Sequence, residues 1–326
     1  MDPGKARPGL ILQAIEPLPL QRPTLPAHCP SEVSITRVGS LTTDLGECPA
    51  WRDGLLWLLD CRQGLVMALD PADGRMVSRV AMPPPLGSFA FDETGPMVLA
   101  LKEQVVTLDV TTGHWSRLAG LDLSHPHLRL NDGCALPDGS FVVGTMHPLR
   151  PPGEAPQGGL YRLGHDITLH RIEQGIGIAN GPAVSPLTGR FHLADSEART
   201  IHSWRLNSDG TLSDRQLFVQ TEAWGSGPDG CCFDDEGGLW TALVRASALA
   251  RFDSIGTLTH WIPLPLTYPS ALCFGGAAMD TMFVTSIRDS GRLSASGSLD
   301  GAVLKVTGAG FRGTARPTTR LLQQRT

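Results

Sequence analysis

The chain has 326 residues, a net charge of −5 and a pI near 6.0. This length allows two average domains or one large all-β or α/β-barrel domain with a substantial buried core. The acidic balance and the lack of any block of like charges argue against a nucleic-acid-binding surface.

The composition predicts many short strands joined by turns, because 37 glycines and 26 prolines are spread along the whole chain. The seven cysteines are odd in number and contain no C-x-x-C pair, which argues against a disulfide framework or a zinc ribbon. We expect most of them to be small buried residues of a cytoplasmic protein in a reducing compartment. They are Cys29, Cys48, Cys61, Cys134, Cys231, Cys232 and Cys273.

The N-terminal residues 1–32 are rich in proline and show little periodicity. Lys5 and Arg7 precede a short apolar run, but Glu16 and Pro17 end it too early for a signal peptide or a membrane span. We therefore predict an irregular N-terminal arm and no membrane association.

From Val33 onward the sequence repeats one pattern: a polar head residue, an apolar strand, a turn with glycine, and a second strand. Six copies begin at residues 47, 88, 131, 180, 229 and 270, with spacings of 41, 43, 49, 49 and 41 residues. Spacings of this size are typical of the four-stranded blades of a β-propeller.

Each copy continues with a third strand, as at 66–70 and 302–306. Ring closure requires a strand from the far terminus, and Val33–Val38 is placed to complete the last blade beside Val303–Val306. The predicted fold is thus an all-β, six-bladed propeller over residues 33–313, followed by a C-terminal tail at 314–326. A β-sandwich or two smaller β domains is the alternative.

The repeat phase places one residue of each copy at the same end of the propeller's central channel, because inner strands of all blades line that channel. Asn-Gly and Asp-Gly are also turn formers, which explains Asp132-Gly133 but not Glu47. Two carboxylates and two carboxamides in a narrow channel repel or are costly to desolvate unless a cation neutralises them, which favours a hard divalent ion held by oxygen. The six head residues are Glu47, Ser88, Asn131, Asn180, Asp229 and Ser270.

The residues at these positions resemble the senescence marker protein/gluconolactonase/regucalcin-like family of six-bladed propellers. The resemblance covers about residues 33–313 and rests on short motifs whose order and spacing are specific. These are Leu-Gly-Glu-Cys-Pro-Ala-Trp at 45–51, Arg-Leu-Asn-Asp-Gly at 129–133, Gly-Thr-Met at 144–146, Asn-Gly at 180–181, Ala-Asp-Ser at 194–196, Gly-Pro-Asp-Gly at 227–230 with Gly-Leu-Trp at 238–240, and Cys-Phe-Gly-Gly at 273–276 with Phe-Val-Thr-Ser at 283–286.

The resemblance implies a metal-dependent lactonase that opens sugar lactones to aldonic acids. It implies metal ligands at Glu47, Asn180 and Asp229, with Asp229 also the general base, and substrate contacts from Arg129 and Asn131. The cation is one divalent ion of the group Ca, Zn, Mn, Mg or Fe. The implied partner is a small sugar lactone, without nucleic acid or membrane, for a monomer or weak homo-oligomer.

One position departs from the family pattern. Many relatives carry an acidic residue shortly after Gly-Thr-Met, whereas His147-Pro148-Leu149-Arg150 follows here. His147 is therefore a candidate substrate contact, with stabilisation of its loop as the alternative. The proline- and glycine-rich segment 148–158 is predicted to form a lid over the channel mouth.

Two other functions stay open at this stage. A non-catalytic propeller that binds calcium or a protein partner fits the same fold, because a fold does not determine a function. A lactonase or esterase for lipophilic or organophosphate substrates is a third possibility, but the predicted lid offers few aromatic residues to hold such a substrate.

Overall fold

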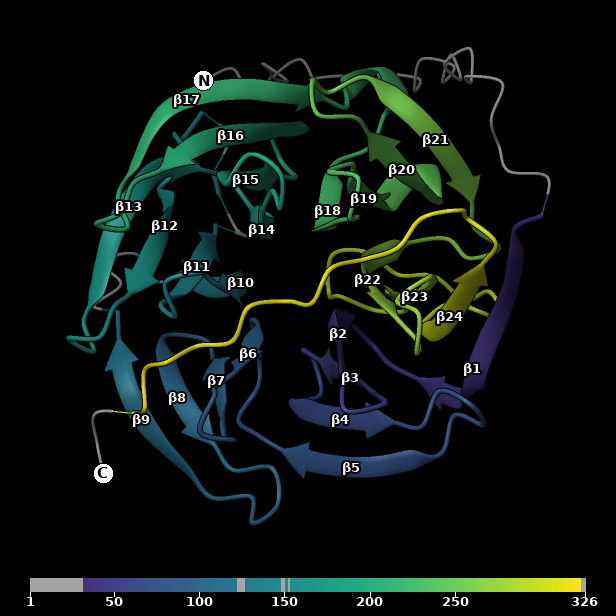
Figure 1. Cartoon of the computed structure of the whole chain (residues 1–326), viewed down its shortest axis with the longest axis horizontal. Coiled ribbons are helices and arrows are strands. Elements are labelled where there is room, and N and C mark those ends of the chain that lie inside the picture. Colours follow the sequence, from purple (N-terminus) through teal and green to yellow (C-terminus); the bar gives the residue numbers. More distant parts are fainter. Residues whose placement is uncertain (1–31, 122–126, 148–149, 152, 324–326) are drawn as a thin grey trace, which may run out of the picture.

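The computed structural model describes residues 32–121, 127–147, 150–151 and 153–323. Six four-stranded antiparallel sheets are arranged around a central channel, as the propeller prediction requires (Figure 1). Five sheets follow the chain order from the channel outward, and the sixth has the order β22-β23-β24-β1. Within the described ranges there is no α-helix, only the short 3-10 helices η1 (Glu222–Trp224) and η2 (Val244–Ala246).

The inner strands line the channel and begin at the predicted head residues. Inner strands of neighbouring blades contact one another, as β10 does with β14 and β14 with β18 (Figure 1). The six are β2 (Gly46–Arg52), β6 (Phe89–Phe91), β10 (Arg129–Ala135), β14 (Ala179–Val184), β18 (Pro228–Phe233) and β22 (Pro269–Gly275).

The middle strands carry the core and are buried on both faces, so they contain continuous apolar runs instead of an alternation. The second strands are β3 (Leu55–Asp60), β7 (Met97–Ala100), β11 (Phe141–Met146), β15 (Arg190–Asp195), β19 (Leu239–Leu243) and β23 (Thr281–Ser286). The third strands are β4 (Leu65–Leu69), β8 (Gln104–Leu108), β12 (Gly158–Leu163), β16 (Thr200–Leu206), β20 (Ala248–Phe252) and β24 (Ala302–Thr307). Their side chains form six apolar clusters, each between two adjacent blades.

The outer strands face solvent on one side, and β5 accordingly alternates half-buried and exposed residues. They are β5 (Met76–Ala81), β9 (Trp115–Gly120), β13 (Leu169–Ile176), β17 (Leu212–Gln220), β21 (Leu258–Pro263) and β1 (Ser34–Thr42). The ring closes as predicted, because β1 pairs with β24 through Ile35 opposite Val306 and Arg37 opposite Leu304.

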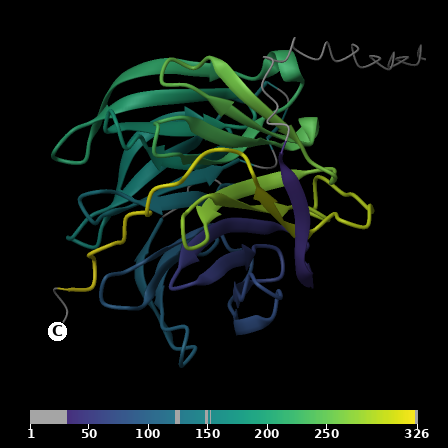
Figure 2. The ribbon, with the colours of Figure 1, turned by 45° about the vertical axis from the view of Figure 1, so that its right-hand side comes forward.

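The C-terminal segment 308–323 does not leave the propeller. It runs across one end of the channel, from the last blade toward β6 and β9 (Figures 1 and 2). Gly313 forms a bridge with Asp234, and Thr319 forms a bridge with Asp92 on the opposite side of the ring. The predicted division into an arm at 1–32, a propeller at 33–313 and a tail at 314–326 remains a prediction, and residues 1–31 and 324–326 lie outside the described residues.

Two further predictions concern membrane association and the cysteines. In the described ranges, no helix has the length and apolar character needed to cross a membrane. The six cysteines within these ranges are free thiols; five are buried and Cys134 is half-buried. Cys29 lies outside the described residues.

A buried ion pair connects two segments of the fifth blade and lies against the start of the C-terminal segment. Arg251 Nε lies 2.6 Å from Asp234 Oδ2, and both side chains are buried. Asp234 also accepts hydrogen bonds from the Trp240 indole and the Gly238 amide, each at 2.8 Å. The guanidinium of Arg251 lies 4.1 Å from the centre of the Phe311 ring, just before the segment crosses the channel.

We predict that Asp234→Ala lowers the free energy of unfolding by about 3–5 kcal/mol, because it leaves the Arg251 charge buried without its partner. Urea unfolding measures the loss. Glu222→Ala is the control, since Glu222 pairs with Arg199 at the surface with 63% of its side chain exposed. A surface pair contributes about 0–1 kcal/mol, so equal losses in the two variants would contradict the assignment.

Candidate active site

The head residues stand where the inner strands begin, at one end of the channel. Glu47 lies in β2, Asn131 in β10, Asn180 in β14 and Asp229 in β18. The remaining two heads are serines: Ser270 lies in β22, and Ser88 directly precedes β6. The carboxylates and carboxamides of this end thus come from four different blades.

Irregular pairing follows the heads and orients them. The register of the inner strand against the second strand shifts between Glu47 and Ala50, and likewise between Asn180 and Ala183. Corresponding shifts occur in β10, β18 and β22. An extra residue on one strand of a pair bends that strand and turns its side chains, a device common beside active sites.

Left-handed backbone follows two of the heads. Cys48 has φ of 50° and Gly181 has φ of 54°. A Cβ at Gly181 would lie 2.6 Å from the carbonyl oxygen of Asp229 and 2.5 Å from the Cys231 sulfur, so only glycine fits there. Cys48 takes the same conformation despite its side chain, which is uncommon and often found at functional sites.

Glu47 and Asp229 are two carboxyl groups in one poorly hydrated space. Burial raises the pKa of Glu47 well above its ordinary value, and the negative charges of Asp229 and Asp132 raise it further. Burial also raises the pKa of Asp229 well above its ordinary value, again with a contribution from Asp132. Like charges held this close are unfavourable unless protons or a cation neutralise them.

Asn180 is held in one orientation by a chain of hydrogen bonds. The Ser196 hydroxyl donates to the Pro228 carbonyl at 2.6 Å, so it must accept from the group that faces it. That group is the amide nitrogen of Asn180, at 2.8 Å. The Asn180 oxygen therefore lies on the other side of the amide, where Asn131 Nδ2 donates to it at 2.6 Å.

Asn131 uses its amide nitrogen entirely within the protein. The nitrogen donates to the Ala179 carbonyl at 2.9 Å and to Asn180 Oδ1. Both N–H groups are thus engaged, and its oxygen is the atom left to meet a ligand.

Asp132 is a channel residue that the sequence did not assign to the site. It lies within β10 and not in a turn, so the turn interpretation of Asp132-Gly133 is wrong. Its carboxylate accepts from the Gly133 and Gly181 amides, each at 2.8 Å, and from the Cys48 thiol at 3.3 Å. It therefore joins β2, β10 and β14 just beyond the heads. The one feature of the sequence that could have identified Asp132 as a site residue was its position directly after the head residue Asn131.

Arg129 and His147 lie close together in the same blade, because Arg129 pairs with Met146 and His147 follows. Arg129 Nη1 donates to the Leu130 carbonyl at 2.9 Å. Burial lowers the pKa of Arg129, while the nearby Glu47 carboxylate acts in the opposite direction. The His147 side chain is 2% exposed, and its backbone amide donates to the Gly177 carbonyl at 3.0 Å. The predicted lid at 148–158 lies partly outside the described residues.

The residues at this end of the channel fit a divalent cation. Glu47 and Asp229 supply negative charge whose burial is unfavourable in the absence of a cation, and Asn180 presents an oriented oxygen. In the described part of the chain there is no group of three or more His, Cys, Asp or Glu side chains arranged to hold a metal. The predicted set contains only two such residues, with a carboxamide as the third ligand.

The SMP-30/gluconolactonase/LRE-like region family model matches residues 45–288, which contain all the head residues. The chain belongs to this family. The predicted resemblance is thereby confirmed.

Curated relatives of the family are similar over most of the chain. A 6-deoxy-6-sulfogluconolactonase of Pseudomonas putida is 33% identical over 75% of this chain and 84% of its own length. Regucalcin of Xenopus laevis is 30% identical over 87% of this chain and 98% of its own length. A pentonolactonase of Haloferax volcanii is 29% identical over 88% of this chain and 98% of its own length.

Solved structures agree with the fold. A luciferin-regenerating enzyme superposes with a TM-score of 0.80 at 23% identity, covering 89% of this chain and 100% of the other. A calcium-binding regucalcin of Agrobacterium tumefaciens superposes with a TM-score of 0.78 at 22% identity, covering 87% of this chain and 97% of the other. At these identities the comparison supports the six-bladed fold alone.

The raised pKa values of Glu47 and Asp229 predict how the metal-free protein responds to pH. A carboxyl group whose pKa is higher in the folded than in the unfolded chain stabilises the fold below its unfolded pKa, near 4. That contribution is lost as the pH rises through the folded pKa. In the presence of a chelator, wild-type protein should therefore lose stability relative to Glu47→Gln as the pH rises above about 4.

Urea unfolding across this pH range tests the prediction. Glu222→Gln is the matched control, because its carboxylate is largely exposed. For the control, the difference in stability from wild type should not change with pH. The same result for Glu47→Gln would contradict the proximity of the two carboxyl groups.

Proposed function

We propose that the chain hydrolyses a sugar lactone to the corresponding aldonic acid, at the channel end formed by Glu47, Asn180 and Asp229, with a divalent cation bound there. The observation that carries the proposal is the pair of buried carboxyl groups beside an oriented carboxamide oxygen, with Arg129 at the same end. Neutral oxygen ligands together with two carboxylates suit a hard divalent cation.

The comparisons support the class of reaction. The family relatives include proteins named as a 6-deoxy-6-sulfogluconolactonase and a pentonolactonase, at about 30% identity over most of the chain. A neighbour in structure from Xanthomonas campestris is described as a gluconolactonase. An enzyme of the lactonase class is accordingly the assignment with the broadest support.

Glu47, Asn180 and Asp229 would hold the cation. When bound there, a divalent ion acts as a Lewis acid that polarises the lactone carbonyl and stabilises negative charge on its oxygen.

Asp229 is the proposed general base. Water adds its oxygen to the carbonyl carbon, the bond from that carbon to the ring oxygen breaks, and the ring oxygen becomes a hydroxyl group by taking from Asp229 the proton that the water lost. The Asp229 carboxylate accepts the proton that the attacking water loses.

Arg129 and Asn131 are the proposed substrate contacts. The amide nitrogen of Asn131 is engaged by Ala179 and Asn180, so Asn131 is suited to accept a hydrogen bond from a sugar hydroxyl through its oxygen. Arg129 would place positive charge where the carboxylate product forms. For His147, near-complete burial favours a loop-stabilising role over a direct substrate contact.

A non-catalytic calcium-binding propeller is the second candidate, and a specific observation favours it. The proposed ligands are all oxygens, which calcium accepts, and one neighbour in structure is described as a calcium-binding protein. Catalysis distinguishes the two functions, because a binding protein requires no general base. Location in the cytoplasm, a monomeric or weakly associated state and the absence of a nucleic-acid partner remain predictions.

We predict that Asp229→Asn lowers aldonolactone hydrolysis by about 10²–10⁴-fold, because the amide cannot accept the proton from water. Acid release from a panel of aldonolactones measures the rate, and circular dichroism checks the fold. Asp235→Asn, an exposed aspartate in the same blade, is the control and should retain full activity. Turnover at the parent rate by folded, metal-loaded Asp229→Asn protein would exclude Asp229 as the base.

The second prediction concerns the cation. Exhaustive chelation should abolish hydrolysis, and addition of divalent ions one at a time should restore it with one favoured ion. Restoration should fail or require far more metal in Glu47→Gln and Asn180→Ala. Unchanged activity in protein shown by elemental analysis to be free of metal would remove the cation from the mechanism.

A further inference from the structure

The channel contains a second cavity beyond the head residues. It has a volume of about 420 Å³ and is lined by the later residues of the inner strands. Glu47, Asn131, Asn180 and Asp229 are not among its lining residues. Asp132 and Cys48, joined by their hydrogen bond, lie between the proposed active site and this cavity. A cavity of this size accommodates a small molecule.

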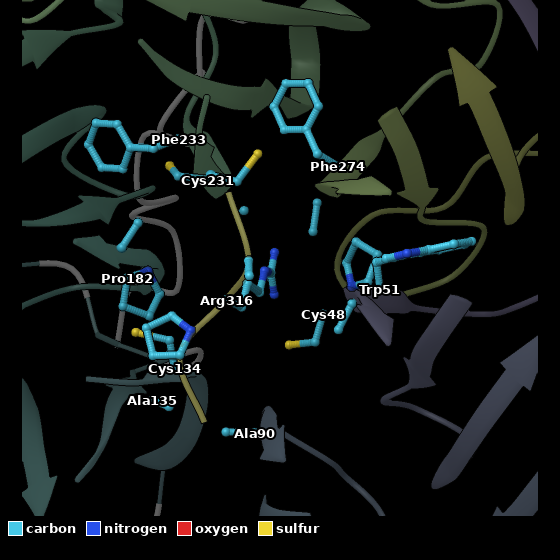
Figure 3. A pocket seen from close by; sticks show the side chains of 18 of the residues that line it. Cys48, Trp51, Ala90, Cys134, Ala135, Pro182, Cys231, Phe233, Phe274 and Arg316 are labelled. Atoms are coloured by element: carbon cyan, nitrogen blue, oxygen red, sulfur yellow. The ribbon is translucent and has the colours of Figure 1, made fainter. Parts of the chain in front are cut away.

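The walls of the cavity are mainly apolar. Trp51, Phe233 and Phe274 are lining residues whose rings point away from the middle of the cavity, whereas Pro182 and the cysteine and alanine side chains lie nearer to it (Figure 3). Such walls bind an apolar body but offer few partners for the hydroxyl groups of a sugar. The chemistry of this cavity therefore differs from that of the proposed lactone site.

The C-terminal segment covers the cavity. Residues 314–318 line it, and the segment is fixed on either side of them. Before the cavity, the Gly313 amide donates to the Met279 carbonyl at 2.7 Å. After it, the Thr319 hydroxyl donates to Asp92 Oδ2 at 2.7 Å, with both side chains buried. Two anchors on different blades thus hold one short stretch over the channel.

Arg316 is the residue that this stretch places in the cavity, where Figure 3 shows its side chain near the middle. Arg316 Nη2 donates to the Leu272 carbonyl at 3.2 Å. In the part of the chain that the structure describes, no carboxylate lies within 4.0 Å of its guanidinium. A guanidinium has five donors, and Arg316 is exposed to solvent, so the donors that Leu272 does not engage are available to a ligand.

The other charged groups of the cavity already have partners. The Asp132 carboxylate is engaged by two backbone amides and the Cys48 thiol. Arg52 lies 4.5 Å above the Phe91 ring and pairs with Asp53 at 3.3 Å. Arg52 Nη1 is buried without a hydrogen-bond partner, so Arg52 adds positive charge to the lining. Arg316, near the middle of the cavity, is the cation best placed to meet a ligand of opposite charge (Figure 3).

We propose that this cavity is a second ligand site, which binds a small carboxylate with an apolar body. The guanidinium of Arg316 pairs with the carboxylate through parallel hydrogen bonds, a geometry that arginine and carboxylate share. The apolar walls enclose the apolar part of the ligand. The site is independent of the proposed lactonase activity and does not suit its hydroxyl-rich product.

The test uses the full-length protein and para-fluorophenylacetate as the probe, with binding followed by ¹⁹F NMR. Wild-type protein should bind this anion and discriminate against para-fluorophenylacetamide, the neutral compound of nearly the same shape. Arg316→Met should weaken binding by about ten- to a hundredfold, the range expected for a lost hydrogen-bonded charge. Arg316→Lys keeps the positive charge but loses the planar pair of N–H donors. Its affinity for the probe should lie between those of wild type and Arg316→Met.

Two controls locate the bound probe. Arg312→Met removes an exposed arginine from the same segment outside the cavity lining and should bind like wild type. Asp229→Asn should also bind like wild type, and an excess of aldonate should not displace the probe. Absence of binding to wild type at millimolar probe, unchanged binding by Arg316→Met, or displacement by aldonate would each overturn the proposal.

Discussion

The constraint on which this site depends is the burial of two carboxyl groups, Glu47 and Asp229, at one end of a narrow channel. Burial raises the pKa of both, the charge of Asp229 raises that of Glu47 further, and the charge of Asp132 acts on both. Burying ionised carboxylates costs free energy, so their presence together at this position indicates a function. Asn180 and Arg129 lie at the same end of the channel, and the proposed cation would balance the charge of the two carboxyl groups.

The propeller provides the geometry for this arrangement. Residues more than a hundred positions apart meet because every inner strand begins at the same end of the channel. The packing between blades is apolar and continuous, which holds the six inner strands in fixed positions while irregular pairing after the heads turns their side chains inward. The apolar packing that stabilises the fold and the polar head residues therefore occupy different portions of the same blades.

Much of this architecture was predictable from the sequence. A repeat of 41–49 residues with alternating apolar strands specifies six blades, and the closing pair of β1 and β24 follows from the need to complete the last blade. The head residues share one phase of that repeat, so their convergence follows from the fold. Glu47 was the informative head, since glutamate has no turn-forming role to explain its position.

Other features depend on contacts that no local pattern records. Asp132 resembles a turn residue, yet its carboxylate joins three inner strands through partners at positions 48, 133 and 181. Asn180 is oriented by the hydroxyl of Ser196, in the turn after β15. Arg316 lies in a segment that has no strand periodicity, and its place in the channel is set by anchors on two distant blades.

The most direct test of the account is the position of the metal in a crystal of manganese-loaded protein, measured by anomalous scattering. The account predicts one strong peak between Glu47, Asn180 and Asp229 at the head of the inner strands, and its disappearance in Glu47→Gln crystals. A peak elsewhere in the channel, or no peak at these residues in protein shown to contain one manganese ion per chain, would contradict it.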